Sequence, residues 1–168
     1  MVAFLVACGG DEGSTSQARE SKPAALVTSP AIVPGFTWKQ SDYAVRCGNR
    51  AVAVAIDAPD GWRASIGSRK ARGGTFELTQ RLRSGKAFQV TFTKGGSKAR
   101  KYFIRCLPEA FPRYRFERIR PGGPRLIMVE MGRYAVAFDR GGVPVWWYLA
   151  SGDVNNARFM GDGTFTYV

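Results

Sequence analysis

The chain has 168 residues, of which 45% are apolar, 12% aromatic and 23% charged, and its 25 Lys and Arg against 13 Asp and Glu give a net charge of +12. This composition excludes a disordered chain, a collagen repeat and a membrane span of about 18 apolar residues, and the length excludes a barrel enzyme of about 250 residues. The sequence contains no histidine, which excludes a Ser-His-Asp triad, a Cys-His pair and any zinc site that needs imidazole.

The first residues have the pattern of a bacterial lipoprotein signal. Leu5, Val6 and Ala7 precede Cys8 as in a lipobox, so we expect Cys8 to be lipid-modified and to anchor the chain to membrane lipid outside the cytoplasm. Because a signal needs a basic segment and an apolar core of about 7 to 15 residues, we expect 1–7 to be a truncated signal. Residues 8–33, rich in Ser, Thr, Ala, Gly and charge, predict a flexible tether. The alternative is a chance apolar start with a buried Cys8.

Residues 34–108 alternate apolar and polar side chains in short runs that are separated by Gly, Pro and Asp. A period of two predicts strands with one buried face, and the spacing of the turns predicts a small antiparallel β-sandwich. The side chains expected to point inward are Tyr43, Val45, Cys47, Val52, Val54, Ile56, Trp62, Ala64, Ile66, Phe76, Leu78, Phe88, Val90, Phe92, Tyr102, Ile104 and Cys106.

Cys47 and Cys106 both have the inward parity of their strands. In an oxidising compartment we expect them to pair, and a closed loop of about 60 residues implies about 4 kcal/mol of stabilisation. Two such cysteines without histidine make a poor metal site, and we expect no metal and no cofactor.

Prolines, glycines and arginines interrupt the alternation over 109–124, which predicts a linker. Its aromatic side chains lie among Arg113, Arg115, Arg118, Arg120 and the nearby Arg125. Aromatics among cations can stack on bases, but no nucleic-acid motif is present, so we expect no nucleic-acid partner. A solvated linker or a surface facing an anionic membrane is the favoured interpretation, and capture of a sulfated or acidic ligand is the alternative.

Residues 125–168 predict a second β unit of four or five short strands, which fits one blade of a β-propeller. Leu126 to Val129 are apolar at every position, which predicts a strand buried on both sides. We expect the chain to be the front portion of a longer protein, because a lone blade would leave Trp146 and Trp147 without neighbours. The alternative is that these strands pack on the sandwich as one compact all-β domain.

Several segments together resemble the N-terminal part of bacterial, especially actinobacterial, arylsulfotransferases of the β-propeller type. They are 34–36, 41–47, 58–62, 102–108 and 139–148. The most specific is the Asp139 turn that leads into Trp146 and Trp147. The resemblance implies a β-sandwich followed by a six-bladed propeller. It also implies transfer of a sulfuryl group from a phenolic sulfate ester to a phenol through a sulfohistidine, outside the cytoplasm.

The chain differs from that family in the residues that carry out sulfuryl transfer. The relatives place their catalytic histidines and arginine in later blades, and this chain has no histidine. No catalytic residue is therefore predicted, and only Cys47, Cys106, Asp139, Trp146 and Trp147 match, as structural residues. We expect the N-terminal portion of an arylsulfotransferase-like lipoprotein, catalytically incomplete, whose full-length form binds an anionic or sulfated aryl small molecule. The alternative is a non-enzymatic envelope module for binding or adhesion.

Overall fold

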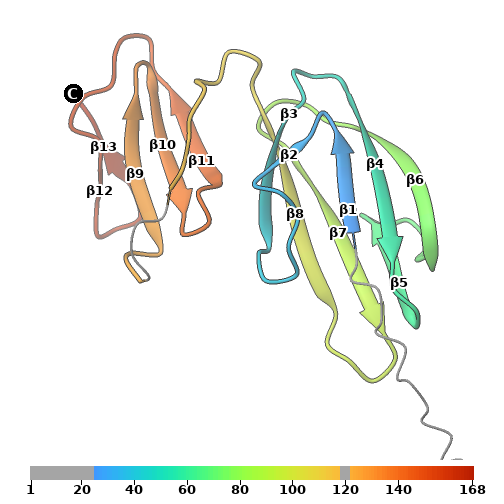
Figure 1. Cartoon of the computed structure of the whole chain (residues 1–168). Helices are drawn as coiled ribbons and strands as arrows, with labels where there is room; N and C mark the ends of the chain where they lie inside the picture. The colour runs from blue at the N-terminus through green and yellow to red at the C-terminus, as the bar shows by residue number, and fades with distance from the viewer. Residues whose placement is uncertain (1–24, 118–121) are drawn as a thin grey trace, which may run out of the picture.

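The computed structural model describes residues 25–117 and 122–168, and these contain strands, turns and no helix (Figure 1). The fold is all-β, as predicted. The strands in chain order are β1 (Ala25–Ser29), β2 (Ile32–Val33), β3 (Asp42–Arg46), β4 (Ala51–Ala58), β5 (Trp62–Ile66), β6 (Gly74–Arg81), β7 (Ala87–Lys94), β8 (Arg100–Leu107), β9 (Leu126–Met131), β10 (Tyr134–Asp139), β11 (Pro144–Leu149), β12 (Arg158–Phe159) and β13 (Phe165–Thr166). With no helix among the described residues, none of them forms a membrane-spanning helix.

The first eight strands form a sandwich of two sheets around one core. One sheet has the order β1-β4-β6 and the other the order β2-β3-β8-β7-β5. The alternation predicts which side chains point inward: Val52, Val54 and Ile56 of β4 are buried, whereas Ala53 between the two valines is exposed. Every residue predicted to point inward belongs to this core or packs against it.

The prediction of a wholly antiparallel sandwich is wrong for one pair of strands. β3 runs parallel to β8, with Tyr43 opposite Ile104. Alternation reports which face of a strand is buried, but it carries no information about the direction of the neighbouring strand. A parallel pair needs a long crossover connection, and here β4 to β7 provide it.

The predicted tether is too long at its C-terminal end. β1 pairs with β4 and β2 pairs with β3, so 25–33 belong largely to the sandwich. Leu26 and Thr28 are buried while Val27 between them is exposed, which is the period of a strand with one buried face. The Ser, Thr, Ala and Pro of this segment hid that pattern. The predicted signal at 1–7, Cys8 and the tether over 8–24 lie outside the described residues.

The described residues of the segment 109–124, which the sequence predicts to be a linker, form no strand. The segment is nevertheless fixed to the sandwich: the Arg46 guanidinium donates to the carbonyl oxygens of Phe111 at 2.6 Å and Pro112 at 2.7 Å. Phe111 is buried. Burial raises the pKa of Tyr114 to about 12, and the Tyr114 hydroxyl has no hydrogen-bond partner among the described residues.

After the linker, the C-terminal unit contains a three-stranded antiparallel sheet of order β11-β10-β9 and a separate hairpin of β12 and β13. The central strand β10 is buried at five consecutive positions, and β9 lies at the edge with most side chains exposed. The prediction that β9 is buried on both sides is therefore wrong, because its apolar run cannot reveal an edge position. Whether this unit begins a propeller stays a prediction.

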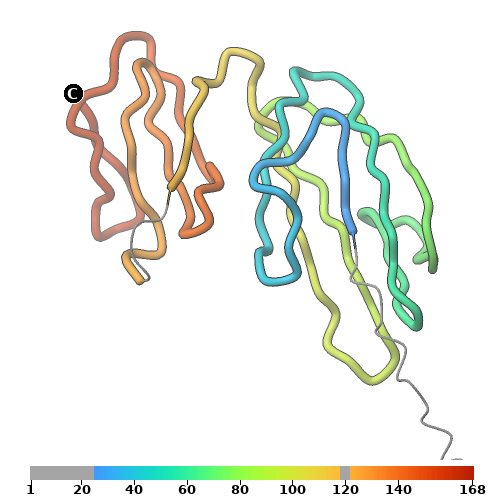
Figure 2. The backbone as a smooth tube through the Cα atoms, viewed as in Figure 1, coloured from blue at the N-terminus to red at the C-terminus, as the bar shows by residue number. Residues whose placement is uncertain are grey.

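The two units lie next to each other, joined by the linker (Figure 2), and a second apolar cluster contains side chains from both units. Ala44 and Leu107 come from the sandwich, Phe111 from the linker, and Tyr134, Val136, Phe138 and Val143 from the C-terminal unit. Its continuous apolar packing holds the two units in one arrangement.

Candidate functional site

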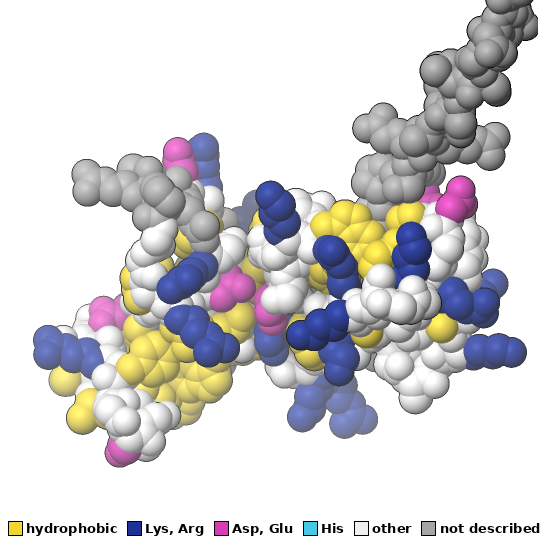
Figure 3. Space-filling model, turned by 90° about the horizontal axis from the view of Figure 1, so that it is seen from below, with side chains coloured by type: hydrophobic (Ala, Val, Ile, Leu, Met, Phe, Trp, Pro, Cys, Tyr) yellow, Lys and Arg dark blue, Asp and Glu magenta, His cyan; other side chains and the backbone are white. Residues whose placement is uncertain are grey.

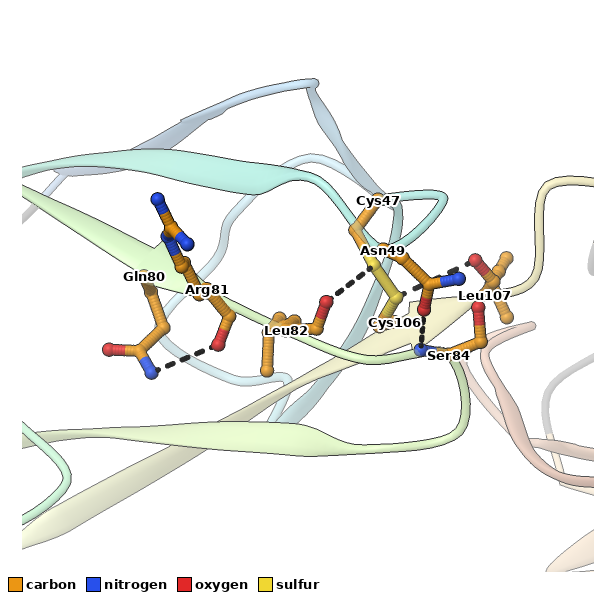
Figure 4. Close-up of a disulfide and its surroundings, with 8 residues drawn as sticks. All are labelled: Cys47, Asn49, Gln80, Arg81, Leu82, Ser84, Cys106 and Leu107. Carbon is orange, nitrogen blue, oxygen red and sulfur yellow. Dashed lines mark hydrogen bonds between the residues drawn. A yellow bond between two sulfur atoms is a disulfide. The ribbon is translucent and has the colours of Figure 1, made fainter.

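The two cysteines predicted to pair form a disulfide in the sandwich core (Figure 4). Cys47 directly follows β3 and Cys106 lies on the neighbouring β8, with Cα atoms 5.4 Å apart. Both are buried. At the same end of the sandwich, the Ser84 backbone N–H donates to Asn49 Oδ1 at 2.9 Å. The disulfide therefore links the end of β3 covalently to β8 in the core.

The other residues matched to the family occupy the C-terminal unit. Asp139 ends β10, and its Oδ1 accepts hydrogen bonds from the backbone N–H groups of Gly141 at 2.8 Å and Val143 at 2.9 Å. This carboxylate shapes the β10–β11 turn, as Asp commonly does. On β11, Trp147 packs against the cluster between the units, whereas Trp146 is 38% exposed. Asp139 and Trp147 thus contribute to the turn and to the packing of this unit.

Where the two units face each other, a cleft of about 750 Å³ opens beside the β10–β11 turn. One wall comes from the β2–β3 loop, the start of β3 and Arg105 of β8. The other comes from the start of β9 and the turn between β10 and β11. The walls touch where the Gln40 side chain lies against Gly141: a Cβ on this glycine would come within 2.6 Å of Gln40 Nε2.

Cationic side chains dominate the cleft. Lys39, Arg105, Arg125 and Arg140 line it, together with the carboxylates of Asp42 and Asp139. Asp42 is already bound by Arg105 Nη2 at 2.8 Å and by the Ser41 hydroxyl, which donates to Oδ2 at 2.8 Å. With Asp139 engaged by the turn, both carboxylates have partners within the protein. The cleft therefore has an excess of positive charge.

Polar groups that can donate hydrogen bonds accompany these charges. Thr37, Gln40 and Ser41 line the sandwich wall, and Leu126 and Val145 add apolar surface on the opposite wall. Arg105 Nε is buried without a hydrogen-bond partner among the described residues. Such a lining suits an anion that also carries an organic body.

The described residues offer no recognisable catalytic centre. They contain no group of three or more His, Cys, Asp or Glu side chains that could hold a metal ion. The sequence lacks histidine, so no Ser or Thr of the cleft has an imidazole base beside it. The lining of the cleft suits binding of an anion.

The basic linker segment, singled out from the sequence, does not form this site. Arg113 and Arg115 are exposed and do not line the cleft, whereas Arg125 does. Arg118 and Arg120 lie outside the described residues. Most of the other cleft residues come from the β2–β3 loop, from β8 and from the β10–β11 turn, which are far apart in the chain. No local sequence pattern predicts that these segments lie together.

Comparisons with protein-family models, with curated proteins and with solved structures found no match to this chain.

Proposed function

We propose that the chain works outside the cytoplasm, held at a membrane through Cys8, and that its described part binds an organic anion in the cleft between the two units. The proposal rests on the cleft, because four cationic side chains face two carboxylates there, and Arg105 is paired with one of them, Asp42. The buried Cys47–Cys106 disulfide supports the location, since structural disulfides persist in oxidising compartments.

The size and lining of the cleft indicate which class of ligand it can bind. A volume of about 750 Å³ is that of a site for a small organic molecule, and far exceeds what one inorganic ion needs. Arginine recognises the oxygens of sulfate, phosphate and carboxylate groups, while Leu126 and Val145 offer contact to an apolar body. A sulfated aryl compound, the ligand class expected from the sequence, combines both features.

Replacing Arg125 by Gln tests the cleft directly. We expect the dissociation constant of 4-nitrophenyl sulfate, measured by isothermal titration calorimetry, to rise about three- to tenfold. Arg125 is exposed, so its loss removes about 0.7 to 1.4 kcal/mol. The affinity should also fall as ionic strength rises, because solvent-exposed charges are screened.

Arg113→Gln provides the matched control, since it removes the same charge from an exposed linker residue that does not line the cleft. It should leave the affinity within about twofold of wild type, and uncharged 4-nitroanisole should bind neither protein. Equal losses in the two variants would mean that the net charge, and not the cleft, attracts the ligand.

A second candidate is that the chain is the N-terminal portion of an arylsulfotransferase-like protein, as the sequence segments suggest. One observation favours it: Trp146, Tyr148, Phe165 and Tyr167 form a continuous aromatic surface with ring centroids 4.6 to 5.9 Å apart. Trp146 is 38% exposed, Tyr148 40% and Tyr167 37%. An exposed apolar surface of this kind is typical of a face that packs against further structure, such as a second blade.

A transfer assay tests this candidate. The purified chain, given 4-nitrophenyl sulfate and an acceptor phenol, should release no 4-nitrophenol above the buffer rate, because it has no histidine to carry the sulfuryl group. The reading frame downstream of codon 168 should encode further blades with histidines. Turnover by the chain itself, or a reading frame without such blades, contradicts the candidate but leaves the binding proposal standing.

A further inference from the structure

One end of the sandwich gathers tryptophans and cations at its surface. Trp62 begins β5 and lies opposite Lys94 of β7, and the rings of Trp38 and Trp62 have centroids 5.3 Å apart. The Arg100 guanidinium lies 4.9 Å from the Trp38 ring and 5.9 Å from the Trp62 ring. We call this surface the basic-aromatic end; it comprises Trp38, Lys39, Trp62, Lys94, Lys98 and Arg100.

The described chain enters the sandwich at this same end. Its first residue, Ala25, pairs with Asp57, close to the β4–β5 turn that leads to Trp62. That turn is closed by the Trp62 backbone N–H, which donates to the carbonyl oxygen of Pro59 at 2.9 Å. Figure 1 shows β1 beginning beside the end of β4, and below it the turn that leads into β5.

Figure 3 looks onto this end and shows Lys and Arg side chains around a patch of hydrophobic ones. The four cations of the basic-aromatic end are exposed, and both tryptophans are half-buried against the sandwich core. The carboxylates near them in the chain are Asp42, which pairs with Arg105, Asp60 in the turn, and Asp57, whose Oδ1 accepts a hydrogen bond from the Thr75 hydroxyl. Positive charge therefore dominates the surface.

Tryptophan beside lysine and arginine is the side-chain combination that favours the boundary between a bilayer and water. The indole ring prefers the level of the headgroups, and each cation near an anionic surface strengthens association about fivefold. The tryptophans here are partly buried and cannot insert deeply, so the attraction is mainly electrostatic and falls with added salt.

We propose that the basic-aromatic end is a docking surface for the anionic headgroups of a lipid bilayer. The inference rests on the proposed anchoring through Cys8, which lies about 17 residues before Ala25 and so holds this end within about 60 Å of the membrane. The chain enters the sandwich where that surface is.

The test uses the full chain with Cys8→Ser, so that no lipid anchor contributes. It should sediment with vesicles of mixed phosphatidylglycerol and phosphatidylcholine, and much less with pure phosphatidylcholine. The added pair Lys94→Gln and Lys98→Gln should weaken partitioning onto the mixed vesicles about twenty-fivefold, because each charge contributes about fivefold. Added salt should release the protein.

The matched control is the pair Arg83→Gln and Lys86→Gln, which removes the same charge from the β6–β7 turn at the opposite end of the sandwich. These four positions are exposed, so thermal unfolding should be similar in both pairs. We expect the control pair to weaken partitioning less than threefold. Equal weakening by the two pairs, equal binding to pure phosphatidylcholine, or tighter binding to heparin or DNA than to the vesicles overturns the proposal.

The outcome is separable from that of the anchoring proposal. Labelling of the wild-type chain with a radioactive fatty acid in an exporting bacterium reports on Cys8 alone, whereas the Cys8→Ser vesicle experiment reports on the basic-aromatic end alone. If 4-nitrophenyl sulfate did not bind in the cleft, the expected vesicle result would still hold, because Lys94 and Lys98 do not line the cleft.

Discussion

Removing the Cys47–Cys106 disulfide should lower the free energy of unfolding by about 4 kcal/mol. The bond joins residues 59 positions apart, and on the entropic model a closed loop of that length restricts the unfolded chain by about this amount. Small domains are stable by only about 5 to 15 kcal/mol, so the loss is a large share of the total. The measurement is guanidinium denaturation of wild type and of the double variant Cys47→Ala and Cys106→Ala.

All proteins in this comparison should carry Cys8→Ser, so that the third cysteine cannot form a wrong pair. Adding reductant should lower the denaturation midpoint of the protein that keeps Cys47 and Cys106. The midpoint of the double variant should not change, because that variant contains no disulfide to reduce. A loss below about 1 kcal/mol would contradict the idea that this staple is needed for the sandwich. A large loss explains why the chain would be poorly stable in a reducing cytoplasm.

The strands of the sandwich could be predicted because each has one buried and one solvated face. Val52, Val54 and Ile56 are buried with exposed or half-exposed alanines between them, and the alternation therefore carries the information directly. The disulfide followed from the same parity, since both cysteines point to the core. The parallel pairing of β3 with β8 could not be predicted, because strand order depends on how distant segments assemble.

Edge positions and segments with few large apolar residues were the other sources of error. β9 is apolar at Leu126, Ile127, Met128 and Val129, yet it lies at the sheet edge, while β10 beside it takes the central place. β1 contributes only Leu26 as a large buried side chain. Its small and polar residues therefore led to the prediction of a tether, although the alternation of a strand is present. In both cases the partners of the strand, and not its own sequence, decide its burial.

Of the properties of the cleft, only its positive charge could be predicted from the sequence. A net charge of +12 indicates an anionic partner, but the walls of the cleft are the β2–β3 loop and the β10–β11 turn. Whether these approach each other is decided by the apolar cluster around Phe111, which joins the linker to both units. The site is therefore a consequence of packing between units.

Phe111→Ala should uncouple the two units. Phe111 is 2% exposed, and its ring lies 5.2 Å from Tyr134 and 5.6 Å from Trp147, centroid to centroid. Truncation of a buried phenylalanine costs about 3 to 5 kcal/mol. We expect the C-terminal unit to unfold at lower denaturant than the sandwich, so that transitions followed by tryptophan fluorescence and by far-ultraviolet circular dichroism separate.

The same variant should weaken 4-nitrophenyl sulfate binding more than tenfold, because the two walls of the cleft no longer hold one position. Phe88→Ala removes another buried ring, 6% exposed, from the sandwich core and should lower stability comparably without opening the cleft. Phe159→Ala, at a side chain that is 46% exposed, should change neither stability nor affinity appreciably. If Phe111→Ala and Phe88→Ala affected the affinity equally, global stability would explain the binding and packing between the units would not.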